Sequence, residues 1–119
     1  MFPEALIIED DEAQGEIFSR AVTQAGYKVT LLHDGAKALD YLQMHTPRLI
    51  VLDLHLPGQN GQHLARAIRA MPHLQNVRLI LATADDRLAE TLHDLSDLVL
   101  LKPISYTQLR DLAARLRAG

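Results

Sequence analysis

The chain has 119 residues, of which 48% are hydrophobic, and its 12 lysines and arginines against 15 acidic residues give a formal net charge of -3. This length suits one domain and leaves too few residues for a second hydrophobic core, so we expect a single domain over residues 1–119. The lack of a basic excess argues against direct nucleic-acid binding. The absence of cysteine excludes a disulfide scaffold and a zinc site with Cys ligands.

The N-terminal residues lack the features of a targeting segment. Their apolar residues form one short run flanked by acidic groups, whereas a signal peptide has a basic start and a longer apolar core. No apolar stretch of the sequence is long enough to span a bilayer. We therefore expect a cytoplasmic protein without membrane insertion.

Five short apolar runs punctuate the chain, and each predicts a strand. Nearly every position within them is apolar, which is typical of strands in a parallel sheet that helices cover on both faces. The runs are residues 5–8, 29–32, 49–52, 79–82 and 98–101.

The segments between these runs carry apolar residues at helical spacing. Gly26 is suited to end the first helix because it tolerates positive φ, and Asn60 is suited to cap the third. Ser105 and Gln108 form a capping box before the last helix. The stripes, in chain order, are Ile17, Phe18, Ala21, Val22, Ala25; Ala38, Leu39, Leu42; Leu64, Ile68, Met71; Leu88, Leu92, Leu95, expected as a short helix; and Leu109, Leu112, Ala113, Leu116.

The resulting order is (βα)5, an α/β arrangement. Strict alternation of strand and helix requires right-handed crossovers, so we expect one five-stranded parallel sheet inside a three-layer sandwich. In such sheets a ligand site lies beyond the carboxyl ends of the strands, where successive connections leave in opposite directions.

Polar residues follow four of the predicted strands. If the first and third strands are neighbours, their ends lie about 5 Å apart. The carboxylates of Glu9, Asp10 and Asp53 then lie close together. Such a cluster repels itself unless a cation neutralises it, and Mg²⁺ fits because it prefers oxygen ligands and leaves room for a phosphate. The residues, in chain order, are Glu9, Asp10, Asp53, Thr83 and Lys102.

Asp53 stands alone at its strand end, where a carboxylate can act as a nucleophile toward phosphorus. Attack by Asp53 develops charge on the phosphoryl oxygens. Magnesium, the Lys102 ammonium and the Thr83 hydroxyl can meet that charge from different sides.

Four motifs at these positions resemble the signature of the response-regulator receiver domain of two-component signalling. They are IIED at 7–10, LDLHLPGQNG at 52–61, ATA at 82–84 and LKP at 101–103, and the resemblance covers the whole chain. Each motif is weak alone, but four in order at strand ends are a specific pattern. The resemblance implies a flavodoxin-like sandwich with strand order 2-1-3-4-5.

The resemblance also implies a metal site. Asp10 and Asp53 would bind Mg²⁺ directly, Glu9 would act mainly through water, and the backbone carbonyl of His55 would complete the protein ligands. Asp53 would become the aspartyl phosphate.

Further roles follow from the same resemblance. Lys102 would contact the phosphoryl group, Thr83 would move toward it, and the Lys102–Pro103 peptide would be cis. The donor would be a phosphohistidine on a sensor histidine kinase or phosphotransfer protein, and the output partner or effector domain is unspecified. The residues leave homodimerisation open. We expect self-phosphorylation and autodephosphorylation but no turnover of an independent substrate.

Simpler interpretations compete at several positions. Acidic residues after the first strand are also favoured at a helix N-terminus, which is our prediction for Asp11 and Glu12. Thr83 can instead cap the following loop, and Lys102 can be a solvated surface lysine. The six histidines, at 33, 45, 55, 63, 73 and 93, show no ligand spacing, and all except His55 are predicted at the surface. His55 is singled out, with Asp85, as a residue that tunes the lifetime of the aspartyl phosphate.

Three other functions compete with this interpretation. An interaction module with the same fold but no phosphotransfer is expected to lack an acidic or lysine residue of the site, and none is missing. A phosphatase of the Asp-x-Asp type needs a second carboxylate where this chain has His55. A phosphate relay without a conventional switch remains open, because Val99 stands where many receivers have an aromatic residue and the segment from Thr83 to Lys102 is short for the family.

Overall fold

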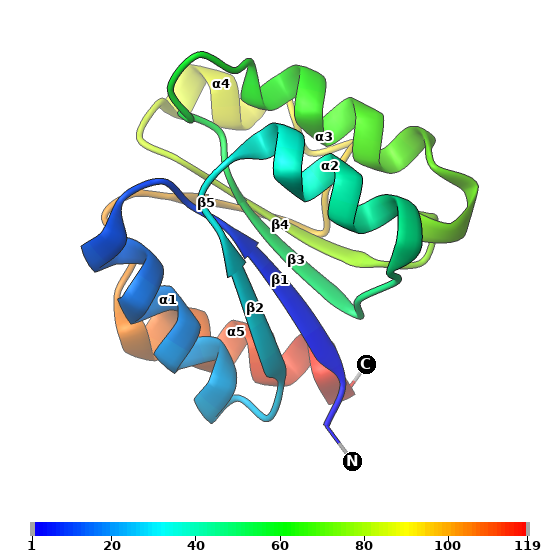
Figure 1. Cartoon of the computed structure of the whole chain (residues 1–119). Coiled ribbons are helices and arrows are strands. Elements are labelled where there is room, and N and C mark those ends of the chain that lie inside the picture. Colours follow the sequence, from blue (N-terminus) through cyan, green and yellow to red (C-terminus); the bar gives the residue numbers. More distant parts are fainter. Residues whose placement is uncertain (1, 119) are drawn as a thin grey trace.

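The structure is a computed structural model that describes residues 2–118, and across them five strands and five α-helices form a three-layer sandwich (Figure 1). None of the helices in this part of the chain is long and apolar enough to cross a membrane. In chain order, the elements are β1 (Glu4–Ile8), α1 (Glu12–Gln24), β2 (Lys28–Leu32), α2 (Gly35–Met44), β3 (Leu49–Asp53), α3 (Gly61–Ala70), the 3-10 turn η1 (Pro72–Leu74), β4 (Arg78–Thr83), α4 (Asp86–Glu90), β5 (Leu98–Leu101) and α5 (Tyr106–Ala118).

The strands form one parallel sheet in the order β2-β1-β3-β4-β5, as expected. The connection after β1 leads to β2 on one side, and the connection after β2 returns past β1 to β3, so β1 and β3 are neighbours although α1, β2 and α2 lie between them in the sequence. Ile8 pairs with Leu52 near the ends of these two strands. The residues that follow the two strands are therefore brought to the same edge of the sheet.

Both faces of the sheet are buried, which explains why the strands are apolar at nearly every position. Neighbouring residues of a strand point to opposite faces. Leu6 and Ile8 of β1 pack into a core with α2 and α3, whereas Ala5 and Ile7 pack into a second core with α1 and α5. Figure 1 shows α1 and α5 on one side of the sheet and α2, α3 and α4 on the other.

Local sequence signals fix the ends of the helices. The side chain of Asn60 accepts a hydrogen bond from His63 N at 3.1 Å, and Ser105 Oγ accepts one from Gln108 N at 3.0 Å, so both predicted caps are confirmed. Gly26 follows α1 with φ of +102°, a conformation that favours glycine.

The fourth helix is shorter than the predicted stripe of leucines. It ends at Glu90, and Leu92 and Leu95 lie beyond it in tight turns whose N–H groups donate three residues back, to Ala89 O and Leu92 O. Leu92 is nonetheless fully buried, and Leu95 packs against the same core. The spacing of the leucines reflects their burial rather than a continuous helix.

Arg69, near the end of α3, ties together the chain segments that enter β4 and β5. Its Nε donates to Leu95 O at 2.6 Å, and its Nη1 donates to Val77 O at 2.7 Å. Its Nη2 lies 3.2 Å from an oxygen of Asp97, and the same carboxylate accepts from Leu79 N at 2.8 Å. We call this network the Arg69 anchor, and it lies at the end of the sheet away from the carboxyl ends of the strands.

Candidate functional site

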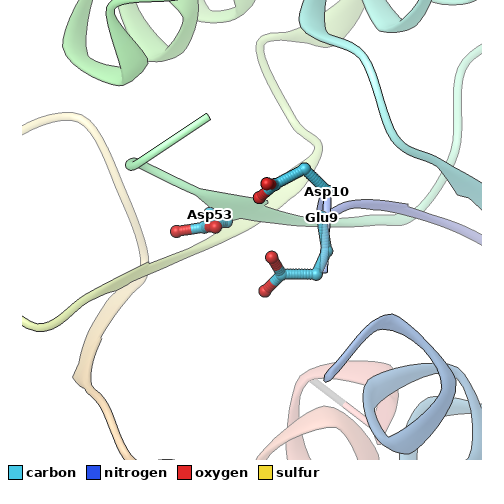
Figure 2. A group of neighbouring side chains, drawn as sticks. All are labelled: Glu9, Asp10 and Asp53. Carbon is cyan, nitrogen blue, oxygen red and sulfur yellow. The ribbon is translucent and has the colours of Figure 1, made fainter. Parts of the chain in front are cut away.

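Three acidic side chains meet at the carboxyl end of the sheet. Glu9 and Asp10 follow β1, and Asp53 is the last residue of β3. One carboxylate oxygen from each lies within 4.8 Å of the other two, and Figure 2 shows the three groups gathered at the ends of the two strands. Glu9 and Asp53 are buried, whereas Asp10 reaches solvent. The predicted crowding of carboxylates is confirmed.

Lys102, directly after β5, is the cation of this cluster. Its Nζ lies 3.2 Å from Glu9 Oε1 and 3.3 Å from Asp53 Oδ1, and its side chain is only 17% exposed. The alternative of a solvated surface lysine is therefore wrong. The backbone N–H of Lys102 donates to Thr83 O at 2.8 Å, and the following Lys102–Pro103 peptide is cis, as expected.

The cluster carries more negative charge than Lys102 neutralises. Burial raises the pKa of Glu9 from its usual 4.5 to about 7, helped by a hydrogen bond and the charge of Asp53, while Lys102 and the N–H of Asp11 act in the opposite direction. One ammonium faces three carboxylates, and the available ligands are oxygens. This set of ligands fits a hard divalent cation such as Mg²⁺.

Thr83, at the end of β4, is buried with its hydroxyl between two partners. Thr83 Oγ1 accepts a hydrogen bond from Asp85 N at 3.0 Å and lies 2.7 Å from His55 Nε2. The bond from Asp85 N agrees with the alternative that Thr83 caps the following loop, whereas the contact with His55 is additional. The contact with His55 was missed from the sequence, although neighbouring strands place both residues at the same edge of the sheet.

His55 also contacts Asp53 through its backbone. His55 N donates to Asp53 Oδ1 at 3.1 Å, so this oxygen is fixed by the N–H and by Lys102 together. The flanking residues Leu54 and Leu56 are each 4% exposed. The backbone at His55 is therefore held between two buried side chains.

The remaining residues considered from the sequence lie outside this cluster. Asp11 caps α1 by accepting from Gln14 N at 2.9 Å, and Glu12 lies in the first turn, as predicted. The five histidines other than His55 are exposed, which confirms their predicted surface placement; they are His33, His45, His63, His73 and His93. Val99 is partly buried against the core beneath α2 and α3.

Comparisons with known proteins agree with this geometry. Residues 5–114 match the model of the response regulator receiver domain. The chain is 30% identical to the probable methanogenesis regulatory protein FilR2 of Methanothrix harundinacea, over 88% of this chain and 75% of that protein. It is 34% identical to the response regulator MprA of Mycobacterium avium, over 95% of this chain and 49% of MprA, so it spans about half the length of that relative.

A solved structure supports the same assignment. The signal receiver domain of a signal transduction histidine kinase from Syntrophus aciditrophicus superimposes with a TM-score of 0.85 at 29% identity, covering 98% of this chain and 91% of that one. The chain belongs to the response regulator receiver domain family, whose standard function is to accept a phosphoryl group in two-component signalling. Receiver domains generally bind Mg²⁺ at acidic residues and act with histidine kinases and output domains.

Proposed function

We propose that Asp53 is the phosphoacceptor of this receiver domain. The observation that carries the proposal is the position of its carboxylate, which lies beside Glu9 and Asp10 and 3.3 Å from Lys102 Nζ. Because Oδ1 is held by Lys102 and by the N–H of His55, we assign the second oxygen, Oδ2, as the nucleophile.

The phosphoryl donor is a phosphohistidine on a sensor histidine kinase or a phosphotransfer protein. Oδ2 of Asp53 forms the new P–O bond while the P–N bond of the donor breaks, and the bonding pair returns to the imidazole nitrogen. The Lys102 ammonium stabilises the charge on the phosphoryl oxygens. Thr83 supplies a further hydrogen bond once its hydroxyl turns toward the group.

The acidic cluster holds Mg²⁺ in this proposal. Asp10 and Asp53 are the direct side-chain ligands, Glu9 acts mainly through water, and the backbone carbonyl of His55 completes the set. When bound, the ion neutralises the negative charge of the phosphoryl group. The whole chain, residues 1–119, then acts as one receiver domain that is a substrate and switch rather than an enzyme with independent turnover.

Acetyl phosphate with Mg²⁺ tests the assignment of Asp53. We expect the wild type to gain the mass of one phosphoryl group, Asp53→Asn to gain none, and Asp111→Asn, an exposed control on α5, to behave as the wild type. Intact mass spectrometry measures the gain. A phosphoryl group that persists in Asp53→Asn places the acceptor elsewhere.

A phosphate relay without a conventional switch is the second candidate. It is favoured by the five-residue α4 and by Val99, which is too small to exchange between inward and outward positions as a large aromatic residue does. Phosphorylation-dependent NMR shifts confined to the surroundings of Asp53, with none between residues 88 and 99, support this candidate over a switching receiver.

A further inference from the structure

The hydroxyl of Thr83 has two hydrogen-bond partners within the resting protein. Thr83 has no exposed surface, and its oxygen accepts from Asp85 N at 3.0 Å. The single hydroxyl proton needs an acceptor, because buried polar groups are almost always paired. Among the described residues, His55 Nε2, at 2.7 Å, is the partner in position to accept that proton, in the tautomer whose ring proton is on Nδ1.

A phosphoryl group on Asp53 requires the same proton. Its oxygens are ionised and only accept hydrogen bonds, so Thr83 can contact them only by donating its hydroxyl hydrogen. His55 and the phosphoryl group therefore compete for one donor. Thr83 must break its bond to His55 before it can reach the phosphorylated carboxylate.

His55 is well placed to hold this bond because its backbone has little freedom. Its N–H donates to Asp53 Oδ1 at 3.1 Å, and Leu54 and Leu56 on either side are buried. The ring is thus presented to Thr83 from a fixed point on the loop after β3. Asp53 ends the strand that precedes this loop, so the proposed nucleophile and the residue that contacts Thr83 are two positions apart.

We propose that His55 is a positioning residue that holds Thr83 in the resting arrangement and so sets how readily Thr83 moves when Asp53 is phosphorylated. The proposal deepens the proposed function and rests on it. Replacement of His55 by a residue without a hydrogen-bond acceptor leaves the Thr83 hydroxyl proton without its partner in the resting state. The phosphorylated arrangement, in which the phosphoryl oxygen accepts that proton, then becomes relatively more stable.

Beryllofluoride with Mg²⁺, used as a stable phosphoryl analogue, tests the competition. We measure the beryllofluoride concentration at half of the change in the backbone amide resonance of residue 83. A net hydrogen bond corresponds to roughly a two- to tenfold change in an equilibrium constant, so His55→Leu should lower this concentration by that factor. His55→Gln, whose amide oxygen can replace Nε2 as acceptor, should stay within about twofold of the wild type.

Thr83→Val separates the hydrogen bond from any other effect of the ring. In this background there is no hydroxyl proton to hold, so His55→Leu should leave the midpoint unchanged. An equal effect of His55→Leu in both backgrounds, or no effect in the wild-type background, overturns the positioning role. If instead the unaltered protein does not bind beryllofluoride, or Asp53→Asn still binds it, the assignment of Asp53 itself fails.

Discussion

Asp10 occupies the most solvent-accessible place in a cluster that is short of positive charge. It lies with Glu9 and Asp53, whereas Lys102 contacts only the latter two among the three carboxylates. Replacement of Asp10 by Asn therefore removes repulsion without breaking an ion pair. In the absence of Mg²⁺ and at low ionic strength, we expect Asp10→Asn to raise the free energy of unfolding by about 0.5–1 kcal/mol.

The same substitution should weaken the response to metal. Millimolar Mg²⁺ stabilises a protein that binds it in the folded state only, so thermal melts should shift upward for the wild type and much less for Asp10→Asn. Asp86→Asn, in the first turn of α4, is the control for the loss of one exposed acidic charge. If Mg²⁺ shifts the melts of both variants as it shifts the wild type, Asp10 does not bind the ion.

The sequence predicted the positions of some site residues but not all of the contacts between them. Glu9, Asp53 and Lys102 were predicted because each ends an apolar strand, and parallel strands end at one edge of a sheet. The contact between His55 and Thr83 was not predicted, because it depends on the rotamers of two side chains that lie far apart in the sequence, one after β3 and one at the end of β4. An apolar pattern carries no information about those rotamers.

The Arg69 anchor connects α3 to the segments that precede β4 and β5. Its guanidinium donates to the carbonyl groups of Val77, before β4, and Leu95, before β5, and pairs with Asp97. It therefore helps to hold the segment between these two strands, in which α4 is only five residues long. The sequence predicted a short helix but not its end, because buried leucines at helical spacing are equally compatible with the turns that follow Glu90.

Loss of this anchor should destabilise the fold. Arg69→Met keeps much of the aliphatic stem but leaves several carbonyl groups and part of the Asp97 carboxylate without their donor, so we expect a loss of about 2–3 kcal/mol in the free energy of unfolding. Arg66→Met, at an exposed position on the same helix, should change it by less than about 0.5 kcal/mol. Urea denaturation measures both variants, and equal effects contradict the anchoring role.

At the scale of the whole molecule, two cores share one sheet. Leu42 belongs to the core under α2 and α3, and Leu109 belongs to the core under α1 and α5; both are fully buried. Because β1 and β3 contribute side chains to both cores, we expect residues 2–118 to unfold as one cooperative unit.

Truncation on either face tests this cooperativity. Leu42→Ala and Leu109→Ala should each lower the free energy of unfolding by about 2–5 kcal/mol. Each should shift the urea midpoint without changing the slope of the transition. Circular dichroism and tyrosine fluorescence should report the same midpoint for each variant. Separate transitions for the two signals, with one face melting first, contradict a single cooperative unit.

The Arg69 anchor has a mechanical consequence for signalling. β4 and β5 are clamped where they enter the sheet, and their paired register is fixed from Ile80 and Leu98 to Thr83 and Leu101. Displacement of Thr83 therefore cannot be relieved by sliding these strands lengthwise. We therefore expect any displacement of Thr83 to be taken up by the segment that follows it, residues 84–91, which includes the five-residue α4.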